Sequence, residues 1–143
     1  VEPILAFTYL NPQGWEVSAE FMYNITTKNK DYKAAPGAAK ETYASGDEFH
    51  VDYLVGKRFG PWGVGVSGYY LKQVESDRLN GDVVMANPGL WSAGRKGRVF
   101  AAGPSVTYTT QGGVHFIGQW QHETGVRNRF GGDKYWFKLI VPL

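Results

Sequence analysis

Apolar and polar side chains alternate along most of the chain with a period of two residues. The clearest example starts at Trp15: the odd-numbered positions through Ile25 are apolar, and the even-numbered positions through Thr26 are polar except Met22. Successive side chains of a β-strand point to opposite faces, so this segment is expected to form a strand with one apolar and one polar face. Helical periodicity is poor throughout.

The same alternation predicts seven strands, joined by connections of two kinds. Short turns containing Gly or Pro are expected at 11–14, 60–61 and 110–113, and long polar loops at 28–46 and 76–97. The predicted strands cover residues 4–10, 15–26, 47–59, 62–75, 98–109, 114–127 and the stretch that follows Gly132 to the C-terminus.

Strand length and loop length together favour a membrane barrel. Strands of about 9–11 residues cross a bilayer when tilted, whereas strands in general average about five or six. Outer-membrane barrels have short periplasmic turns and long extracellular loops, and this chain alternates short and long connections in that way. We therefore expect an all-β, transmembrane antiparallel β-barrel in the bacterial outer membrane. A soluble sandwich with the aromatic rings as its core is the alternative.

The order of short and long connections also orients the expected barrel. If the short turns are periplasmic, the loops near 28–46 and 76–97 are extracellular and the C-terminus is periplasmic. The outward row Phe137, Leu139, Val141 and Leu143 resembles the C-terminal signal read by the barrel-assembly machinery. Aromatic rings favour membrane interfaces. The rings expected there are those of Trp15, Tyr23, Phe59, Trp62, Tyr70, Tyr108, Trp120 and Phe137.

The amino-acid composition excludes some kinds of site and partner but does not indicate a function. Cysteine is absent from the 143 residues, which excludes disulfide frameworks and cysteine metal sites. The net charge of +2 is small and dispersed, so nucleic acid is not an expected partner. Aromatic residues make up 15% of the chain and glycines number 19, a combination that suits closed β architectures.

Several short motifs follow one another over nearly the whole chain. They are Thr8–Pro12, Gly14–Ser18, Tyr43–Asp52, Gly68–Tyr70 with Gln73 and Asp77, Gly103–Pro104, Gln121–Glu123 and Arg127–Arg129. As an ordered set they resemble the outer-membrane channel family named for the meta-pathway of phenol degradation. The resemblance implies a monomeric barrel of about twelve strands that passes small molecules across the outer membrane. Family members are considerably longer, and these motifs correspond to their C-terminal part.

Seven is an odd number of strands, whereas single-chain bacterial barrels use even numbers. Lipid also does not tolerate open strand edges. We therefore expect residues 1–143 to be the C-terminal part of one barrel domain, with Val1 on the extracellular side. About five further strands would come from the N-terminal part of the same barrel, as a separate chain or a missing segment.

The polar faces of the predicted strands supply the candidate site. Their side chains are expected to line the lumen, where they brace the barrel and filter solutes by size and charge. The pore-lining residues expected are Glu16, Glu20, Glu48, His50, Asp52, Gln73, Glu75, Gln119, Gln121, Glu123, Arg127 and Lys138.

The sequence therefore predicts a channel for passive diffusion of small molecules, aromatic or hydrophobic ones among them, and not an enzyme. One face of a predicted strand carries Glu48, His50 and Asp52, which could help to hold a metal. We favour a hydrogen-bond network for these three side chains, and we expect no cofactor or metal. A structural or plugged barrel is the first alternative. A lipid hydrolase using outward His122 is the second, although no partner Ser is evident.

The expected partners follow from that placement. They are outer-membrane lipid and lipopolysaccharide, detergent in their place in crystals, the N-terminal part of the barrel, and a small-molecule solute.

Overall fold

The computed structural model describes residues 1–142 and is almost entirely β-structure. Within this range, no helix is long and apolar enough to span a membrane. The long strands are β1 (Ile4–Leu10), β2 (Trp15–Asn24), β5 (Glu48–Phe59), β6 (Trp62–Gln73), β9 (Arg98–Thr109), β10 (His115–Arg127) and β11 (Asp133–Ile140).

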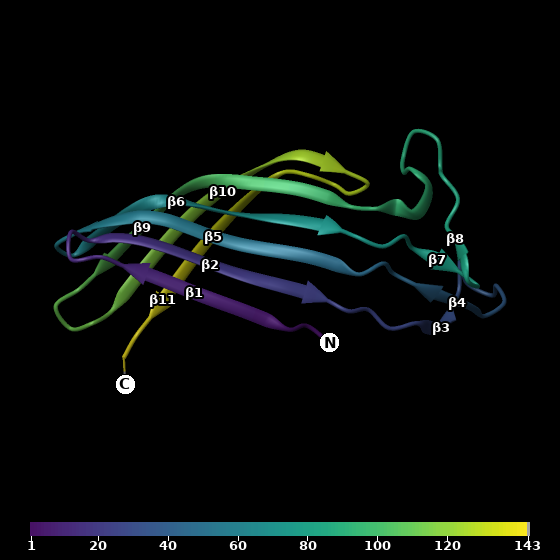
Figure 1. Cartoon of the computed structure of the whole chain (residues 1–143), viewed down its shortest axis with the longest axis horizontal. Helices are drawn as coiled ribbons and strands as arrows, with labels where there is room; N and C mark the ends of the chain where they lie inside the picture. Colours follow the sequence, from purple (N-terminus) through teal and green to yellow (C-terminus); the bar gives the residue numbers. More distant parts are fainter. Residues whose placement is uncertain (143) are drawn as a thin grey trace.

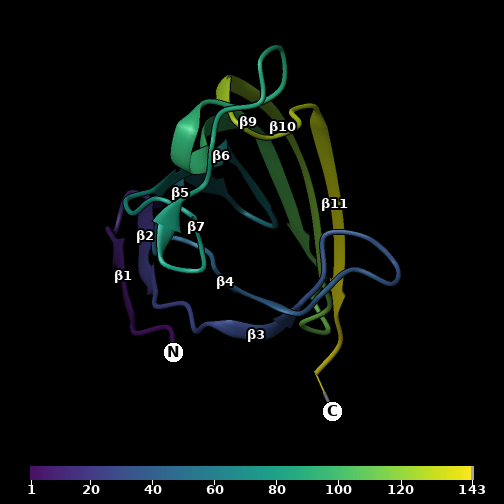
Figure 2. The same cartoon turned by 90° about the vertical axis from the view of Figure 1, so that its right-hand side faces the viewer.

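These seven strands form one antiparallel sheet in the order β1-β2-β5-β6-β9-β10-β11. Each long strand therefore pairs with the next long strand along the chain, as in a meander. Viewed along the strands, the sheet curves into an arc, with β1 and β11 on opposite sides (Figure 2). The predicted number of long strands is confirmed, and no sheet of residues 1–142 is closed into a barrel.

The two long connections are more ordered than the predicted loops. They contain β3 (Asn29–Tyr32), β4 (Glu41–Ala44), β7 (Arg78–Leu79) and β8 (Asp82–Val83), which form a four-stranded sheet, and a short 3-10 helix, η1 (Ala93–Arg95). The small sheet lies beyond the ends of the long strands, opposite the short turns (Figure 1). Strands of two to four residues are too short for periodicity to reveal, so the sequence pattern missed them.

The register of the long strands separates two faces of the arc. Glu20, Asp52 and Tyr69 are cross-strand neighbours on one face, called the inner face here. Phe21, Val51 and Tyr70 are neighbours on the other, the outer face. Phe137 and Leu139 of the predicted C-terminal row belong to β11, whereas Val141 follows the strand and Leu143 lies outside the described residues.

Burial is inverted relative to a water-soluble protein. The buried hydrophobic core consists of Tyr69, Val99 and Ala101 alone within the described residues, whereas Ser67, Gln73, Asp77, Ser105, Gln121 and Glu123 are buried polar residues. Large apolar side chains of the outer face are exposed, and Phe137 reaches 75%. Soluble monomers rarely expose contiguous apolar patches of this kind, so the outer face is expected to have an apolar surrounding.

One glycine of the outer face is covered by an aromatic ring. A Cβ at Gly68 would lie 1.9 Å from the Ala101 carbonyl oxygen and 2.7 Å from Cζ of Tyr53. The Tyr53 ring stacks on Phe100 at 6.1 Å, and its hydroxyl donates to the Ala101 carbonyl at 2.9 Å. Gly68 therefore lets the Tyr53 side chain cross β6 and reach β9, as aromatic side chains do when they cover strand glycines.

Gly68→Ala is expected to destabilise the sheet by about 1–3 kcal/mol, because the added methyl group collides with the Ala101 carbonyl oxygen and with the Tyr53 ring, whose hydrogen bond to that oxygen is displaced. Denaturant unfolding of the protein in lipid vesicles measures the change. Gly118→Ala is the control: Gly118 is also on the outer face of a long strand, and a Cβ there meets nothing within 4 Å. If the two variants are equally stable, the close packing of the Ala101 carbonyl and the Tyr53 ring over Gly68 is wrong.

Candidate functional site

The inner face gathers nearly all the polar residues that alternation predicted there. A row of cross-strand partners runs through Glu20, Asp52, Tyr69, Ala101 and Glu123. The predicted residues that lie on this face are Glu16, Glu20, Glu48, His50, Asp52, Gln73, Gln119, Gln121, Glu123 and Lys138. Their role in lining a pore stays a prediction.

The inner face is hollowed by two adjoining cavities. One, of about 490 Å³, is lined by Glu20, Asp52 and Tyr69 on one side and by Lys134, Trp136 and Lys138 of β11 on the other. The second, of about 540 Å³, lies toward the short turns and is lined by Glu16, Arg58 and His115 among others. Leu54 and Gln119 border both cavities, so the two adjoin along the strands and are together called the hollow.

Glu123 is the centre of a buried polar network on the inner face. Its side chain is 4% exposed, and its Oε1 accepts a hydrogen bond from the Tyr69 hydroxyl. The backbone N–H of Gly132 donates to Oε2 at 3.0 Å, and Lys134 Nζ lies 3.5 Å from Oε1. Lys134 also lies 4.2 Å from the centre of the Tyr69 ring. The network joins three strands, β6, β10 and β11.

Smaller hydrogen-bonded pairs continue this wall. Gln119 donates to Ser105 Oγ at 3.2 Å, and Gln121 donates to Ser67 Oγ at 3.4 Å. On the opposite wall, Arg58 donates to Glu16 at 2.8 Å. Such cross-strand pairs fix the side chains that shape the hollow.

Charge is distributed unevenly around the hollow. The wall built by β2 and β5 carries the carboxylates Glu16, Glu20, Glu48 and Asp52, of which Glu16 alone is paired with an arginine, Arg58. His50 Nε2 lies 3.0 Å from Asp52 Oδ1, although it is buried there without a hydrogen bond. The β11 wall carries Lys134 and Lys138. Carboxylates on one wall of the hollow therefore face lysines on the other, of which Lys134 is paired with Glu123.

Two of the predicted pore-lining residues are placed elsewhere. Arg127 was expected on the inner face, but a β-bulge between Thr124 and Arg127 shifts the register, so Arg127 pairs with Arg98 on the outer face. Gly125, inside the bulge, has a φ of 59°. Glu75 follows the end of β6 and is exposed in the next connection.

Sequence reasoning also missed members of the inner face. Lys134 and Trp136 line the β11 wall of the first cavity, and Arg58 lines the second. Their signal was available, because Lys134 and Trp136 alternate with outward Tyr135 and Phe137 in β11. The prediction for that strand considered the apolar row on its outer face and left out the alternating residues of its inner face.

The eight aromatic residues predicted at membrane interfaces all lie on the outer face. Near the short turns, the Trp62 and Tyr108 rings lie 4.6 Å apart. Lys57 Nζ lies 5.3 Å from the Trp15 ring and 5.5 Å from the Phe59 ring. These four rings therefore lie on the outer face at that end of the sheet. Their contact with lipid stays a prediction.

Comparison with known proteins identifies the family of this chain. The family model described as "Putative MetA-pathway of phenol degradation" matches residues 1–139. The chain belongs to that family. No curated protein and no solved structure matches it. The resemblance inferred from the ordered motifs is therefore confirmed as to family, and the structure of this phenol-degradation family member shows what those motifs build.

Several of the motif residues of this family member meet where the long strands end. Asp77, 8% exposed, accepts hydrogen bonds from the Gly46 N–H at 2.9 Å, from Gln73 Nε2 at 2.7 Å and from the Tyr43 hydroxyl. The Gly97 N–H donates to Gln73 Oε1 at 3.3 Å. Asp77 thus ties the small sheet to the end of β6.

The Tyr43 hydroxyl is sensitive to high pH. Burial and the neighbouring Asp77 carboxylate raise the pKa of Tyr43 from about 10 to about 12, because both disfavour a tyrosinate. The pKa of Tyr43 is higher in the folded protein than in the unfolded chain. The protonated Tyr43 hydroxyl therefore contributes fully to stability below about pH 10, and this contribution is lost between about pH 10 and 12.

Tyr43→Phe is expected to remove one tyrosinate titration with a midpoint near pH 12. Below pH 10 the variant should be less stable than the wild type by about 1 kcal/mol, since a half-buried hydrogen bond is lost. That deficit should disappear as the pH rises to 12. Tyrosinate absorbance and denaturant unfolding at each pH measure both effects. Tyr32→Phe, whose ring packs on Tyr43 at 5.0 Å, is the control and should keep the titration.

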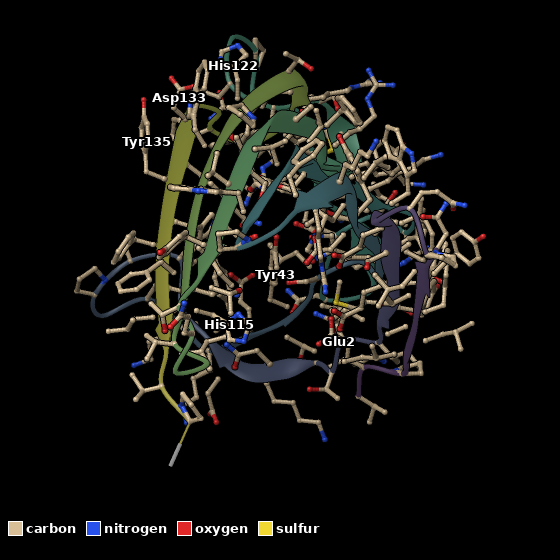
Figure 3. All side chains as sticks on the ribbon, turned by 90° about the vertical axis from the view of Figure 1, so that its left-hand side faces the viewer. Glu2, Tyr43, His115, His122, Asp133 and Tyr135 are labelled. Carbon is tan, nitrogen blue, oxygen red and sulfur yellow. The ribbon has the colours of Figure 1, made fainter. Side chains whose placement is uncertain are left out.

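Outward His122 has a partner that the sequence did not indicate. His122 Nδ1 and Trp120 Nε1 each lie 2.9 Å from Asp133 Oδ1. Figure 3 shows His122, Asp133 and Tyr135 outside the arc and His115 inside it. A hydrolase would also need a nucleophile, and Ser105, the serine of neighbouring β9, is on the inner face. Among residues 1–142, no group of three acidic or histidine side chains is arranged to hold a metal ion.

Proposed function

We propose that the chain forms part of an outer-membrane β-barrel channel through which small molecules diffuse passively. The observation that carries this proposal is the inverted burial: polar side chains are buried on the inner face, and apolar side chains are exposed on the outer face. A barrel in lipid around an aqueous lumen requires that distribution. The long antiparallel meander and the family membership support it as well.

Closure of this barrel requires further strands. β1 and β11 each have one edge without a strand partner in the sheet, and lipid does not tolerate open edges. We infer that the N-terminal part of the same barrel, as a separate chain or a further segment, pairs with both. A total of about twelve strands fits the even numbers of bacterial barrels.

The proposed orientation follows from the connections. The short turns would face the periplasm together with the C-terminus, and the small sheet would face the extracellular side, where lipid and lipopolysaccharide surround the rim. The apolar outer face between them would lie in the hydrocarbon core.

The solute is proposed from the walls of the hollow. Tyr69 and Trp136 supply aromatic surface, while carboxylates and lysines face one another across the first cavity. Small aromatic molecules with polar substituents fit such a wall, and the phenol-degradation name of the family agrees with that class. The proposal includes no catalysis. Its alternatives are a barrel with a plugged lumen and a lipid hydrolase acting through His122.

Conductance of the intact barrel in planar bilayers tests the proposal. The wild type should conduct, and Lys138→Glu should raise its cation preference about twofold, a modest factor because lumen water screens the charge. Glu20→Lys should act in the opposite direction. Lys57→Glu changes a charge of the outer face and is the control, with unchanged selectivity.

Absence of conductance would favour the plugged barrel. Equal selectivity of all variants would contradict the placement of Lys138 and Glu20 in the lumen. Lipid turnover that is lost in His122→Ala would replace the channel by the hydrolase.

A further inference from the structure

Three positively charged side chains stand in one row on the outer face. Lys72 of β6 is the cross-strand partner of Arg98 of β9, and Arg98 is the partner of Arg127 of β10. All three residues are exposed, and none forms an ion pair within residues 1–142. Adjacent strands lie about 4.8 Å apart, so the row spans on the order of 10 Å.

The β-bulge in β10 is what completes this row. Without the extra residue, Arg127 would face the hollow and Val126 would face outward. With it, Val126 packs against the core of Tyr69, Val99 and Ala101, and Arg127 stands beside Arg98. Bulges commonly re-aim a side chain in this way.

The row marks the edge of the apolar outer face. Continuing across the sheet, the same register row contains Phe49 and Tyr23. One step toward the short turns, the outer face carries Tyr70 and Phe100. The cations therefore lie at the end of the long strands next to the small sheet, where the proposed barrel leaves the hydrocarbon core.

Like charges directly opposite one another destabilise a sheet unless an anion compensates them. The inner-face carboxylates cannot do so, because they point to the other side of the sheet. No carboxylate of residues 1–142 forms an ion pair with the row either, so we expect the compensating anion to approach from outside the barrel. Arginine favours phosphate in particular, because its planar guanidinium can donate two parallel hydrogen bonds.

We propose that Lys72, Arg98 and Arg127 form a binding site for the phosphate groups of lipid A, the membrane anchor of lipopolysaccharide. This rests on the proposed function, which puts this end of the strands in the outer leaflet. Both parts of lipid A match the surface that they would contact. The phosphates bind the row of cations, and the acyl chains lie along the apolar surface of Tyr70 and Phe100.

Binding of the intact barrel to phosphatidylcholine vesicles containing diphosphorylated lipid A tests the site. The triple variant Lys72→Gln, Arg98→Gln, Arg127→Gln should bind about fivefold more weakly per charge removed, and on the order of 100-fold more weakly overall. Vesicles with dephosphorylated lipid A should bind both proteins equally. The double variant Arg98→Lys, Arg127→Lys keeps the charge and should lose less affinity than the triple variant.

The control variant Lys28→Gln, Lys30→Gln, Lys33→Gln removes the same charge from the same end of the molecule, but from the segment around β3. It should keep near wild-type affinity. Equal losses in both triple variants would show nonspecific attraction and overturn the site, as would wild-type affinity of the row variant. Conductance separates this proposal from the channel: the row variant should conduct normally, whereas a wild type that fails to conduct contradicts the proposed function alone.

Discussion

Val55→Arg is expected to destabilise the folded protein in lipid by about 2–4 kcal/mol, the range for arginine near the bilayer midplane on the lipid face of a barrel. Val55 lies near the middle of β5 on the outer face, between Val17 and Val66 of the neighbouring strands, and is 44% exposed. Denaturant unfolding of the barrel in phosphatidylcholine vesicles measures the loss.

The neighbouring residue in the chain provides the matched control. Leu54 faces the hollow between Ser18 and Ser67, and it borders both cavities. Leu54→Arg introduces the same side chain one residue away and should be tolerated, because lumen water solvates it. In a soluble protein, the exposed site at Val55 would accept arginine at least as readily. That result would contradict the lipid-facing assignment of the outer face.

Glu123→Ala is expected to lower stability by about 3 kcal/mol, the cost of removing one partner from a buried, hydrogen-bonded charge. The substitution leaves the buried Tyr69 hydroxyl without its acceptor and the Gly132 N–H without Oε2. It also removes the anion beside Lys134 and Arg129. Since the network joins β6, β10 and β11, we expect hydrogen exchange to increase along β11 in particular.

Glu20→Ala is the control for the Glu123 network. Glu20 lines the same hollow but forms no side-chain hydrogen bond or ion pair within residues 1–142, so its removal should change stability by less than about 0.5 kcal/mol. If Glu123→Ala is as mild as Glu20→Ala, the carboxylate is solvated in the lumen. The network would then not brace the wall.

The long strands and their faces were predictable because their pattern repeats over many residues. In β2, five outward positions from Trp15 to Tyr23 are apolar, and a one-residue slip in register would invert all of them. A local irregularity in one strand made the prediction for Arg127 wrong. The extra residue near Gly125 turned Arg127 outward, and nothing in the alternation before it reveals a bulge.

The network around Asp77 shows a second limit. The sequence singled out Tyr43 and Gly46 in one motif and Gln73 and Asp77 in another, but their convergence depends on two connections folding against each other. Gly46 is required there because a Cβ would lie 2.1 Å from the Glu75 carbonyl oxygen. Such long-range contacts have no periodic signature in the chain, so the structure was needed to find them.

The central claim is tested most directly by measuring whether lipid or water contacts each face of β5. The chain has no cysteine, so single cysteines at Val51, Asp52, Leu54 and Val55 can carry spin labels without background labelling. In vesicles, labels at Val51 and Val55 should be relaxed mainly by oxygen, which concentrates in lipid. Labels at Asp52 and Leu54 should be relaxed mainly by a water-soluble nickel complex. Preferential relaxation of the Val51 and Val55 labels by nickel would contradict a lipid-facing outer surface, and with it the membrane barrel.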